Sequence, residues 1–232
     1  MKQNKLSIII PVFNEEASIA KLIKEINTRS TFKQIDEIIV VDGGSTDNTT
    51  TVATTLNVTV ISSEKGRAKQ MNAGAKVANG DILYFLHADT IPPYQFDCKI
   101  LKAITDQNAA GSFRMQFDSK SIFLKFFAWF TRINHKVCRG GDQSLFITKD
   151  LFFKLNGFNE EYIIYEDGEF IERLYKATNF SVIQDKVTTS ARKYQEKGMV
   201  KLQYHFGVIH LKKILGKTPQ ELHNYYKKNI AN

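Results

Sequence analysis

With 232 residues, the chain is long enough for one large α/β domain, or for one domain with a C-terminal appendage. Hydrophobic residues make up 43% of it and charged residues 24%, which is ordinary for a globular protein and argues against extended disorder. The formal net charge of +8 favours polyanionic partners (nucleic acid, anionic lipid or phosphorylated ligands) without choosing among them.

Cysteine usage and the N-terminal segment bear on the compartment. Cys98 and Cys138 stand far apart and outside any Cys-x-x-Cys or Cys/His cluster, which argues against a disulfide framework and a structural zinc site. Residues 1–5 lead into a strand-like run without a signal-peptide pattern, and no apolar run approaches the roughly 20 residues that span a bilayer. We therefore expect a cytoplasmic protein.

Two hydrophobic periods alternate over the first hundred residues. Strand-like apolar runs occupy residues 6–13, 37–42, 58–62 and 82–86, and helical spacing follows each of them, at residues 19–26, 52–56, 68–78 and 96–104. Because the strand runs are apolar throughout, we expect them to be buried on both faces. The β-α-β-α repetition then predicts a parallel sheet between layers of helices.

The second half is expected to extend the sheet and to add helices. Residues 113–117 alternate apolar and polar side chains, the pattern of a strand with one exposed face, and residues 144–148 form another candidate strand. Helices are expected before Gly157, which fits the position just past a helix end, and over residues 166–177. The Thr-Pro-Gln-Glu sequence at residues 218–221 predicts a capped helix start.

An aromatic segment stands out at residues 122–133, where charged and hydroxyl side chains are confined to Lys125, Thr131 and Arg132. Two interpretations stay open. It is either a core helix of the second half or a helix at a membrane or acceptor surface, where aromatic and basic residues are favoured.

Polar, glycine-containing or charged residues follow each of the four N-terminal strands. They are residues 11–16, 42–49, 66–67 and 87–90, in chain order. Turn and helix-cap chemistry explains each stretch singly. Because ligands gather at the carboxyl ends of strands in a parallel sheet, the four stretches together predict a polar cleft.

Several side chains of this cleft suit a phosphate-bearing ligand. Asp42 ends an apolar strand, where its carboxylate can accept from a nucleobase or from ribose hydroxyls. Arg67 begins a helix, whose N-terminus favours a diphosphate. His87 and Asp89 stand two residues apart at a strand end, so both are expected to project to one side, as ligands for Mn²⁺.

Glu166 and Asp167 begin a predicted helix, where the helix dipole favours negative charge. They are either the acidic first turn of a helix or a general base, and an aspartate there is expected to be ionised at neutral pH. The residues alone thus indicate an α/β enzyme that acts on a phosphate-bearing ligand.

Taken together, these segments resemble the family 2 glycosyltransferases of the GT-A fold. The matching stretches are residues 8–16, 40–49, 66–74, 86–89, 157–158 and 166–167, so the resemblance covers roughly residues 5–195. The sequences Gly-Arg-Ala-Lys-Gln-Met-Asn (residues 66–72) and Leu-His-Ala-Asp-Thr (residues 86–90) are similar to those of a small soluble bacterial subgroup of the family. The resemblance implies a Rossmann-like, mostly parallel sheet flanked by helices over residues 1–195. A helical extension, residues 196–232, would pack on or beside it.

The resemblance also implies roles at matching positions. The donor-binding residues would be Pro11, Asn14, Glu16, Asp42, Gly43, Ser45, Arg67, Asn72 and, by a looser match, Arg192. Asp167 would be the catalytic base with Glu166 beside it, and Asp89 would bind the metal. Asp142 is not part of the family match, but we expect it to face the acceptor or sugar and to be the alternative base, because Gly140 and Gly141 leave its loop free to approach.

One position departs from the family pattern. His87 stands where the family's DxD motif has its first aspartate, and a neutral imidazole supplies less negative charge than a carboxylate. Metal affinity should therefore fall and the preference should shift towards Mn²⁺ over Mg²⁺. Whether His87 contacts the metal is left open.

The activity implied by the resemblance is a metal-dependent, inverting transfer of a hexose from a nucleotide-diphosphate donor, UDP-sugar first, to an acceptor hydroxyl. A lipid-linked acceptor and a weak contact with the inner membrane face are further hypotheses. Nucleic-acid binding is not expected, because base-stacking platforms are not evident. The alternatives are a non-catalytic nucleotide-sugar or polyanion-binding module and a sugar nucleotidyltransferase. The latter should carry a Gly-rich, basic loop after the first strand, which residues 11–16 lack.

Overall fold

The computed structural model describes residues 4–31, 33–104 and 108–231. Residues 1–3, which belong to the N-terminal segment considered above, lie outside the described residues. The strands are β1 (Leu6–Val12), β2 (Ile35–Asp42), β3 (Thr59–Ser62), β4 (Ile82–Phe85), β5 (Thr90–Ile91), β6 (Ala110–Phe117), β7 (Leu145–Thr148) and β8 (Phe180–Thr189). The α-helices are α1 (Glu16–Arg29), α2 (Thr49–Thr54), α3 (Arg67–Val77), α4 (Phe96–Ala103), α5 (Ile122–Trp129), α6 (Lys149–Lys154), α7 (Glu166–Ala177), α8 (Arg192–Lys197), α9 (Met199–Ile214) and α10 (Pro219–Tyr226). Short 3₁₀ turns are η1 (Phe130–Arg132), η2 (Lys136–Cys138) and η3 (Gly141–Gln143), and the π-helical turn η4 (Lys227–Ala231) follows α10.

Within the described residues the strands form one sheet in the order β3-β2-β1-β4-β7-β6-β8-β5. The four N-terminal strands are parallel, and β7 lies antiparallel between β4 and β6. β6 and β8 are again parallel, with β5 antiparallel at the edge. The predicted α/β fold with a mostly parallel sheet flanked by helices is therefore confirmed.

Strands β5 and β8 were not predicted. In β8 the apolar alternation is interrupted by residues 184–186, where the register against β6 shifts between Phe113 and Arg114. Two residues of β8 are left without a partner at this irregularity, so no period-2 pattern runs through the strand.

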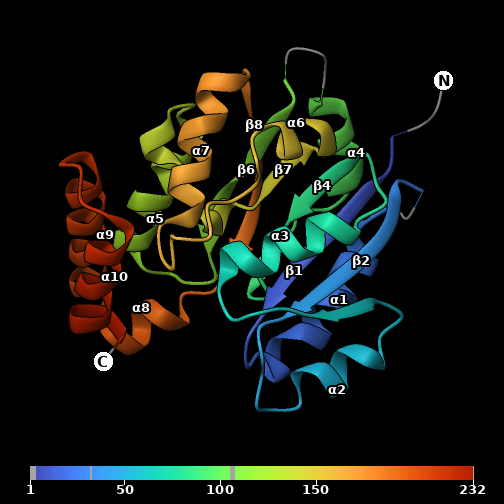
Figure 1. The fold of residues 1–232 in the computed structure, drawn as a ribbon, viewed down its shortest axis with the longest axis horizontal. Coiled ribbons are helices and arrows are strands. Elements are labelled where there is room, and N and C mark those ends of the chain that lie inside the picture. The colour runs from blue at the N-terminus through green and yellow to red at the C-terminus, as the bar shows by residue number, and fades with distance from the viewer. Residues whose placement is uncertain (1–3, 32, 105–107, 232) are drawn as a thin grey trace.

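Helices cover both faces of the sheet (Figure 1), and on each side a layer of buried residues lies between the helices and the sheet. Ile8 and Ile10 of β1 point to the layer of α1 and α4, whereas Ile9 points to the layer of α3, α6 and α7. This alternation explains why the strand is apolar at every position, as expected for a strand that is buried on both faces.

The C-terminal helices form a further layer with α5 and with the segment before α7. Leu124 and Tyr162 share one buried cluster with Leu202, Ile209 and Leu222. Figure 1 places α9 and α10 at the end of the molecule away from β2 and β3. The predicted division between residues 195 and 196 lies inside α8. Among the described residues, no helix is both long and apolar enough to cross a bilayer.

Two predicted helix ends can be compared with the structure. The capping box at Thr218 and Glu221 is present, with Pro219 at the first helical position. Gly157, by contrast, does not directly follow a helix cap. The C-cap of α6 is Leu155, so the residue just past the helix end is Asn156 and not Gly157. Both Asn156 and Gly157 adopt left-handed backbone conformations, with φ of 59° and 61°.

Candidate active site

The loops that follow β1 and β2 are joined by hydrogen bonds. The backbone N–H of Asn14 donates to Ser45 Oγ at 2.9 Å, and the N–H of Thr46 donates to Asn14 Oδ1 at 2.8 Å. The carboxylate of Glu16 accepts from the N–H of Asn48 at 2.9 Å. Pro11 is buried in β1, where it is aligned with Val41 of β2. The structure therefore brings together the residues predicted to form the nucleotide wall.

Asp42 is buried at the end of β2 and finds its donors in its own turn. Its carboxylate accepts from the N–H groups of Gly44, at 2.9 Å, and Ser45, at 3.1 Å. These bonds offset the cost of burying the charge and set its orientation before any ligand arrives.

Gln70 is a residue of this wall that sequence reasoning missed. Its buried side-chain amide donates to the carbonyls of Val12 and Val41, at 2.7 and 2.8 Å, and so ties the ends of β1 and β2 to α3. A Cβ at Gly43 would lie 2.9 Å from Gln70 Cδ, so the turn needs glycine there. The sequence signal that could have revealed Gln70 is its polar side chain beside Ala68 and Met71, on the apolar face of α3.

Phe13 was also missed. Its ring is exposed at the end of β1, and the ammonium of Lys65 lies 3.7 Å from the ring centroid. An exposed aromatic face beside a cation suits a planar, negatively charged ligand.

Charged groups from four separate segments converge next to this wall. Arg67 Nη1, on the first turn of α3, lies 3.8 Å from Glu166 Oε1, at the start of α7. His87 lies between two carboxylates: Nδ1 is 3.8 Å from Asp142 Oδ1, and Nε2 is 3.9 Å from Asp167 Oδ2. These distances exceed hydrogen-bond lengths, so the imidazole stands beside both carboxylates without bonding to either.

The predicted geometry of the His87–Asp89 pair needs correction. β4 ends at Phe85, and the N–H of Thr90 donates to the carbonyl of His87 at 3.0 Å, so both residues lie in a turn beyond the strand. Strand alternation therefore does not set their directions. In the part of the chain that the structure describes, no group of three or more His, Cys, Asp or Glu side chains could hold a metal ion by itself.

Burial changes the charge state expected at the centre. It raises the pKa of Asp167 to about 8, helped by the negative charges of Glu166 and Asp142 and opposed by Arg67. Burial likewise raises the pKa of Glu166 against the attraction of Arg67. The expectation that the helix N-terminus keeps Asp167 ionised at neutral pH was wrong for the ligand-free protein, because desolvation outweighs the helix dipole.

Burial and neighbouring charges also shift the pKa values of Asp142, His87 and Arg67. Burial and the charge of Asp89 raise the pKa of Asp142, against Arg67 and Lys193. Burial, with Arg67, lowers the pKa of His87 to about 3, so its imidazole is neutral at pH 7. Desolvation acts to lower the pKa of Arg67, but the surrounding carboxylates outweigh it and the pKa rises.

The loop that carries Asp142 is fixed from inside by Arg139, another residue that was not predicted. Its buried guanidinium donates to Gln143 Oε1 at 2.6 Å and to the carbonyls of Thr131 and Ile133 at 2.5 Å each. Gly140 has open space around it, as predicted for a free loop, but Gly141 does not. A Cβ at Gly141 would lie 2.0 Å from Asp167 Oδ2.

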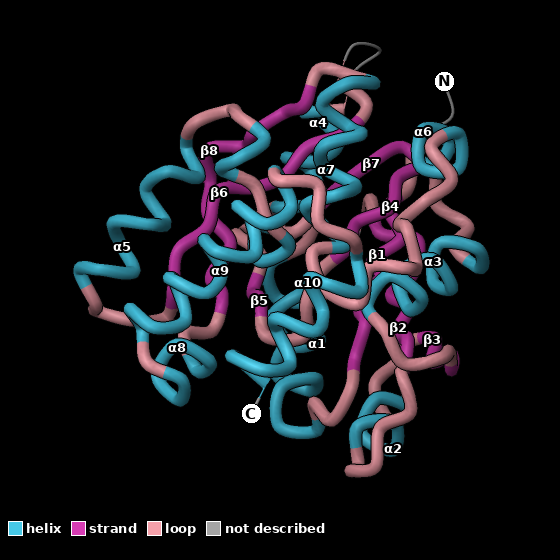
Figure 2. The backbone as a smooth tube through the Cα atoms, turned by 60° about the vertical axis from the view of Figure 1, so that its left-hand side comes forward, coloured by secondary structure: helices cyan, strands magenta, loops and turns pink. Residues whose placement is uncertain are grey.

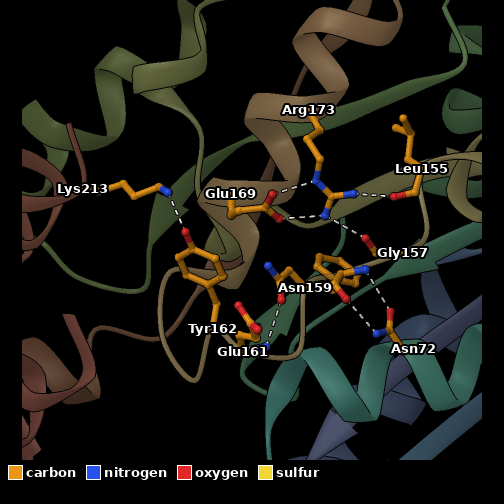
Figure 3. Close-up of polar contacts among 10 residues, drawn as sticks. Asn72, Leu155, Gly157, Asn159, Glu161, Tyr162, Glu169, Arg173 and Lys213 are labelled. Carbon is orange, nitrogen blue, oxygen red and sulfur yellow. Dashed lines mark hydrogen bonds and ion pairs between the residues drawn. The ribbon is translucent and has the colours of Figure 1, made fainter. Parts of the chain in front are cut away.

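Asn72 has partners other than those predicted. Its Nδ2 donates to Glu160 Oε1 at 2.8 Å. Nδ2 also donates to Phe158 O at 2.9 Å and Oδ1 accepts from the N–H of Phe158 at 2.9 Å, the bonds drawn as dashed lines at Asn72 in Figure 3. Arg173 of α7 donates to the carbonyl of Gly157 in the same loop. The amide of Asn72 is thus engaged in holding the loop between α6 and α7, rather than pointing free into the cleft.

Arg192 reaches the first loop from the C-terminal side. Its Nη2 lies 3.5 Å from Glu15 Oε1, so the start of α8 borders the same edge of the sheet as Asn14 and Glu16. The donor-binding role that the looser match implies for Arg192 stays a prediction.

The sequence that forms β1 to β7 decides the family. The profile described as "Glycosyl transferase family 2" matches residues 7–155, which include nearly all of β1, the strands β2 to β7, and Arg67, His87, Asp89 and Asp142 of the centre. The chain belongs to glycosyl transferase family 2. Asp167 and Glu166 lie beyond the matched residues.

Curated relatives of this glycosyltransferase match parts of the chain. A glycosyltransferase named AglE from Haloferax volcanii is 32% identical over 98 residues, 39% of this chain and 32% of its own length. An undecaprenyl-phosphate 4-deoxy-4-formamido-L-arabinose transferase from Sodalis glossinidius is 30% identical over 126 residues, 49% of this chain and 38% of that relative. The chain therefore spans about a third of the length of these two relatives.

Solved structures share the fold. A mannosyltransferase from Pyrobaculum calidifontis, in complex with GDP-Man and Mn²⁺, superposes with a TM-score of 0.71 at 18% identity. The match covers 97% of this chain and 70% of that one. TarS from S. aureus, in complex with UDP, gives a TM-score of 0.67 at 23% identity over 80% of this chain and 60% of that one. At these identities the likeness establishes the GT-A-like fold.

Proposed function

We propose that this glycosyltransferase transfers a hexose from a nucleoside-diphosphate sugar, with UDP as the preferred nucleotide, to an acceptor hydroxyl with inversion. The observation that carries the proposal is the convergence of Arg67, His87, Asp142 and Asp167 beside the wall that holds Asp42. Such a cleft offers separate groups for a base, a diphosphate and a reacting hydroxyl. UDP comes first because TarS binds it, although the mannosyltransferase binds GDP-mannose.

The charge balance of the centre supports a divalent cation. Four carboxyl groups, those of Asp89, Asp142, Glu166 and Asp167, act on the guanidinium of Arg67, and Asp167 adds its negative charge to the centre once it has lost its proton to act as the base. An anionic diphosphate would be repelled there unless a cation accompanied it. The donor set fits the ion, because the neutral imidazole of His87 makes no hydrogen bond with the described residues and Asp89 supplies a carboxylate.

Asp89 and His87 would hold Mn²⁺, or less readily Mg²⁺, and the ion would supply charge stabilisation for the departing diphosphate. Because the described protein groups are too few to bind the ion alone, the remaining ligands would be oxygens of the donor. Metal and nucleotide should therefore bind with strong mutual coupling.

Asp167 would remove the proton from the acceptor hydroxyl while that oxygen attacks the anomeric carbon. It is buried against Glu166 and packed on the backbone of Gly141, which fixes its direction. Arg67 remains beside it and stabilises its ionised form, and Asp142, half-exposed, is placed to accept a hydrogen bond from the sugar or the acceptor. A lipid-linked acceptor at the cytoplasmic membrane face is part of this proposal, supported by the undecaprenyl-phosphate relative.

Calorimetry with purified protein tests the donor site. UDP and GDP are titrated with and without Mn²⁺, and Mn²⁺ is titrated with and without UDP. We expect UDP to bind at least tenfold more tightly with Mn²⁺ present, and Asp89→Asn to remove this coupling while Asp42→Ala weakens UDP in both conditions. If neither nucleotide binds at millimolar concentration with Mn²⁺, the donor-site assignment fails.

A further inference from the structure

Helix α5 turns an apolar stripe to solvent. Ile122, Phe126 and Trp129 follow one another at spacings of four and three residues, which places them on one face of the helix. Ile122 is 83% exposed and Trp129 49%. The opposite face, with Leu124 and Ala128, is buried. Helix α5 of the aromatic segment thus buries one face in the protein core and exposes the other face to solvent.

The charge around this stripe has one sign. Residues 119–134 include three basic side chains, those of Lys120, Lys125 and Arg132, and no aspartate or glutamate. Arg132 places its guanidinium 5.1 Å from the centre of the Trp129 indole, so a cation stands beside the largest exposed ring. Lys120 and Lys125 are exposed as well.

Helix α9 repeats the pattern. Val200, Tyr204, Leu211 and Ile214 are exposed at spacings that keep them on one side of the helix. Residues 197–220 contain lysines but no acidic residue. The helices are neighbours at their N-terminal ends, where Ser121 Oγ lies 3.2 Å from Met199 Sδ, and Figures 1 and 2 both show α5 beside the C-terminal helices.

We propose that the α5–α9 face, defined as the exposed apolar residues of these two helices with their flanking lysines and Arg132, docks on the surface of an anionic lipid bilayer. An anionic interface buries the apolar side chains and neutralises the basic ones at once. A second copy of the chain would bring like charges together, which disfavours self-association through this face. Tryptophan beside arginine suits the headgroup region, where one end of the ring system is apolar and the other wet.

The docking face is connected to the catalytic centre. Helix α5 continues through η1 and η2 to η3, and Arg139 binds Thr131 and Ile133 on the way to Asp142. If the proposed transfer to a lipid-linked acceptor holds, docking brings the membrane-borne hydroxyl to the side of the molecule that carries Asp142. Docking itself does not depend on that function.

Trp129 is the single tryptophan of the chain and reports on this face directly. The full chain, without donor or metal, is mixed with vesicles of phosphatidylcholine alone or with one third phosphatidylglycerol, at low and at physiological salt. With the anionic vesicles we expect a blue shift of Trp129 emission and quenching by lipids brominated on their acyl chains. Added salt should weaken partitioning at least tenfold, and pure phosphatidylcholine should bind weakly.

Matched variants separate this face from general attraction of a basic protein. Lys125→Glu, on α5, and Lys24→Glu, on α1, change the net charge equally, and both lysines are exposed. Lys125→Glu should lower partitioning at least tenfold and Lys24→Glu less than threefold. Ile122→Ser should also lower it, whereas Val77→Ser, an exposed apolar residue of α3, should not.

Three outcomes would overturn the proposal: unchanged Trp129 emission with anionic vesicles at low salt, equal losses for the two lysine variants, or a lipid-independent blue shift that grows with protein concentration. The last outcome would indicate a dimer. None of these outcomes bears on UDP binding as measured by calorimetry, so the docking proposal and the proposed function can be refuted independently of each other.

Discussion

The backbone of Gly141 packs directly on the carboxylate of Asp167. A Cβ at this glycine would stand 2.0 Å from Asp167 Oδ2 and 2.8 Å from His87 Cε1. The missing side chain therefore lets three segments meet: η3, the turn after β4 and the first turn of α7. The position of the proposed base is therefore set by the bare backbone of Gly141, a residue without a side chain.

Gly141→Ala should impair catalysis more than binding. The added methyl must displace Asp167, and misplacing a reacting group by about 1 Å can cost about 10²-fold in rate. We expect the transfer rate to fall by about that factor and the affinity for UDP to change less than threefold. Gly140→Ala is the matched control, because nothing lies within 4 Å of its Cβ and its backbone is extended. Equal losses in the two variants would contradict this account.

Asp167→Asn should lower the transfer rate by about 10²–10⁴-fold, the usual contribution of a general base. The base must be ionised, and its raised pKa of about 8 means that activity is lost as pH falls through that region. The rate of the native enzyme should therefore rise between pH 6 and 8.5, with its midpoint at or below 8, because a bound cation favours the carboxylate. The residual rate of the variant should be independent of pH over this range. A pH profile retained in the variant would assign the base elsewhere, with Asp142 next.

The raised pKa of Asp167 also predicts that the Asp167→Asn variant is more stable than the native protein, and more so at pH 8 than at pH 4.5. Between pH 4 and 8 the folded protein holds a proton on Asp167 that the unfolded chain releases, so this group lowers stability progressively as pH rises through that window. Asp167→Asn removes the effect. We expect its melting temperature to exceed that of the native protein by a few degrees at pH 8 and by little at pH 4.5, as measured by calorimetric scans. A gain that is the same at both pH values would show that titration is not its cause.

Asn72→Ala should act on stability and leave nucleotide binding nearly intact. Removing the amide leaves the buried N–H and carbonyl of Phe158 without their partner, at about 1–3 kcal/mol. Denaturant unfolding should show this loss, while calorimetry with UDP and Mn²⁺ should show less than a threefold change. Asn27→Ala, an exposed site on α1, serves as the comparison and should change neither. A tenfold loss of UDP affinity would restore the donor role that the resemblance implied.

The sequence predicted the parallel half of the sheet because β1, β4 and the second half of β2 are buried on both faces and read as continuous apolar runs. The edge strand β3 is only partly buried, so the expectation of burial on both faces was wrong for residues 58–62. The strand-end motifs were predictable for a related reason: parallel strands bring their carboxyl ends to one edge, so Asn14, Asp42 and Arg67 had to lie near one another. β8 escaped because its pattern is interrupted where its register shifts. The structural roles of Gln70 and Arg139 were not predicted, because their hydrogen-bond partners are backbone carbonyls of other segments, which only the fold brings beside them.

The sequence by itself determined the fold class, the polar edge of the sheet and the family to which the chain belongs, since local periodicity and motif spacing suffice for these. Only the tertiary structure decided the charge states and directions of the centre. The raised pKa of Asp167 and the lowered pKa of His87 arise from desolvation by residues far apart in the chain. The two sides of the aromatic helix were decided in the same way, because burial of Leu124 and exposure of Trp129 depend on where α9 and α10 pack.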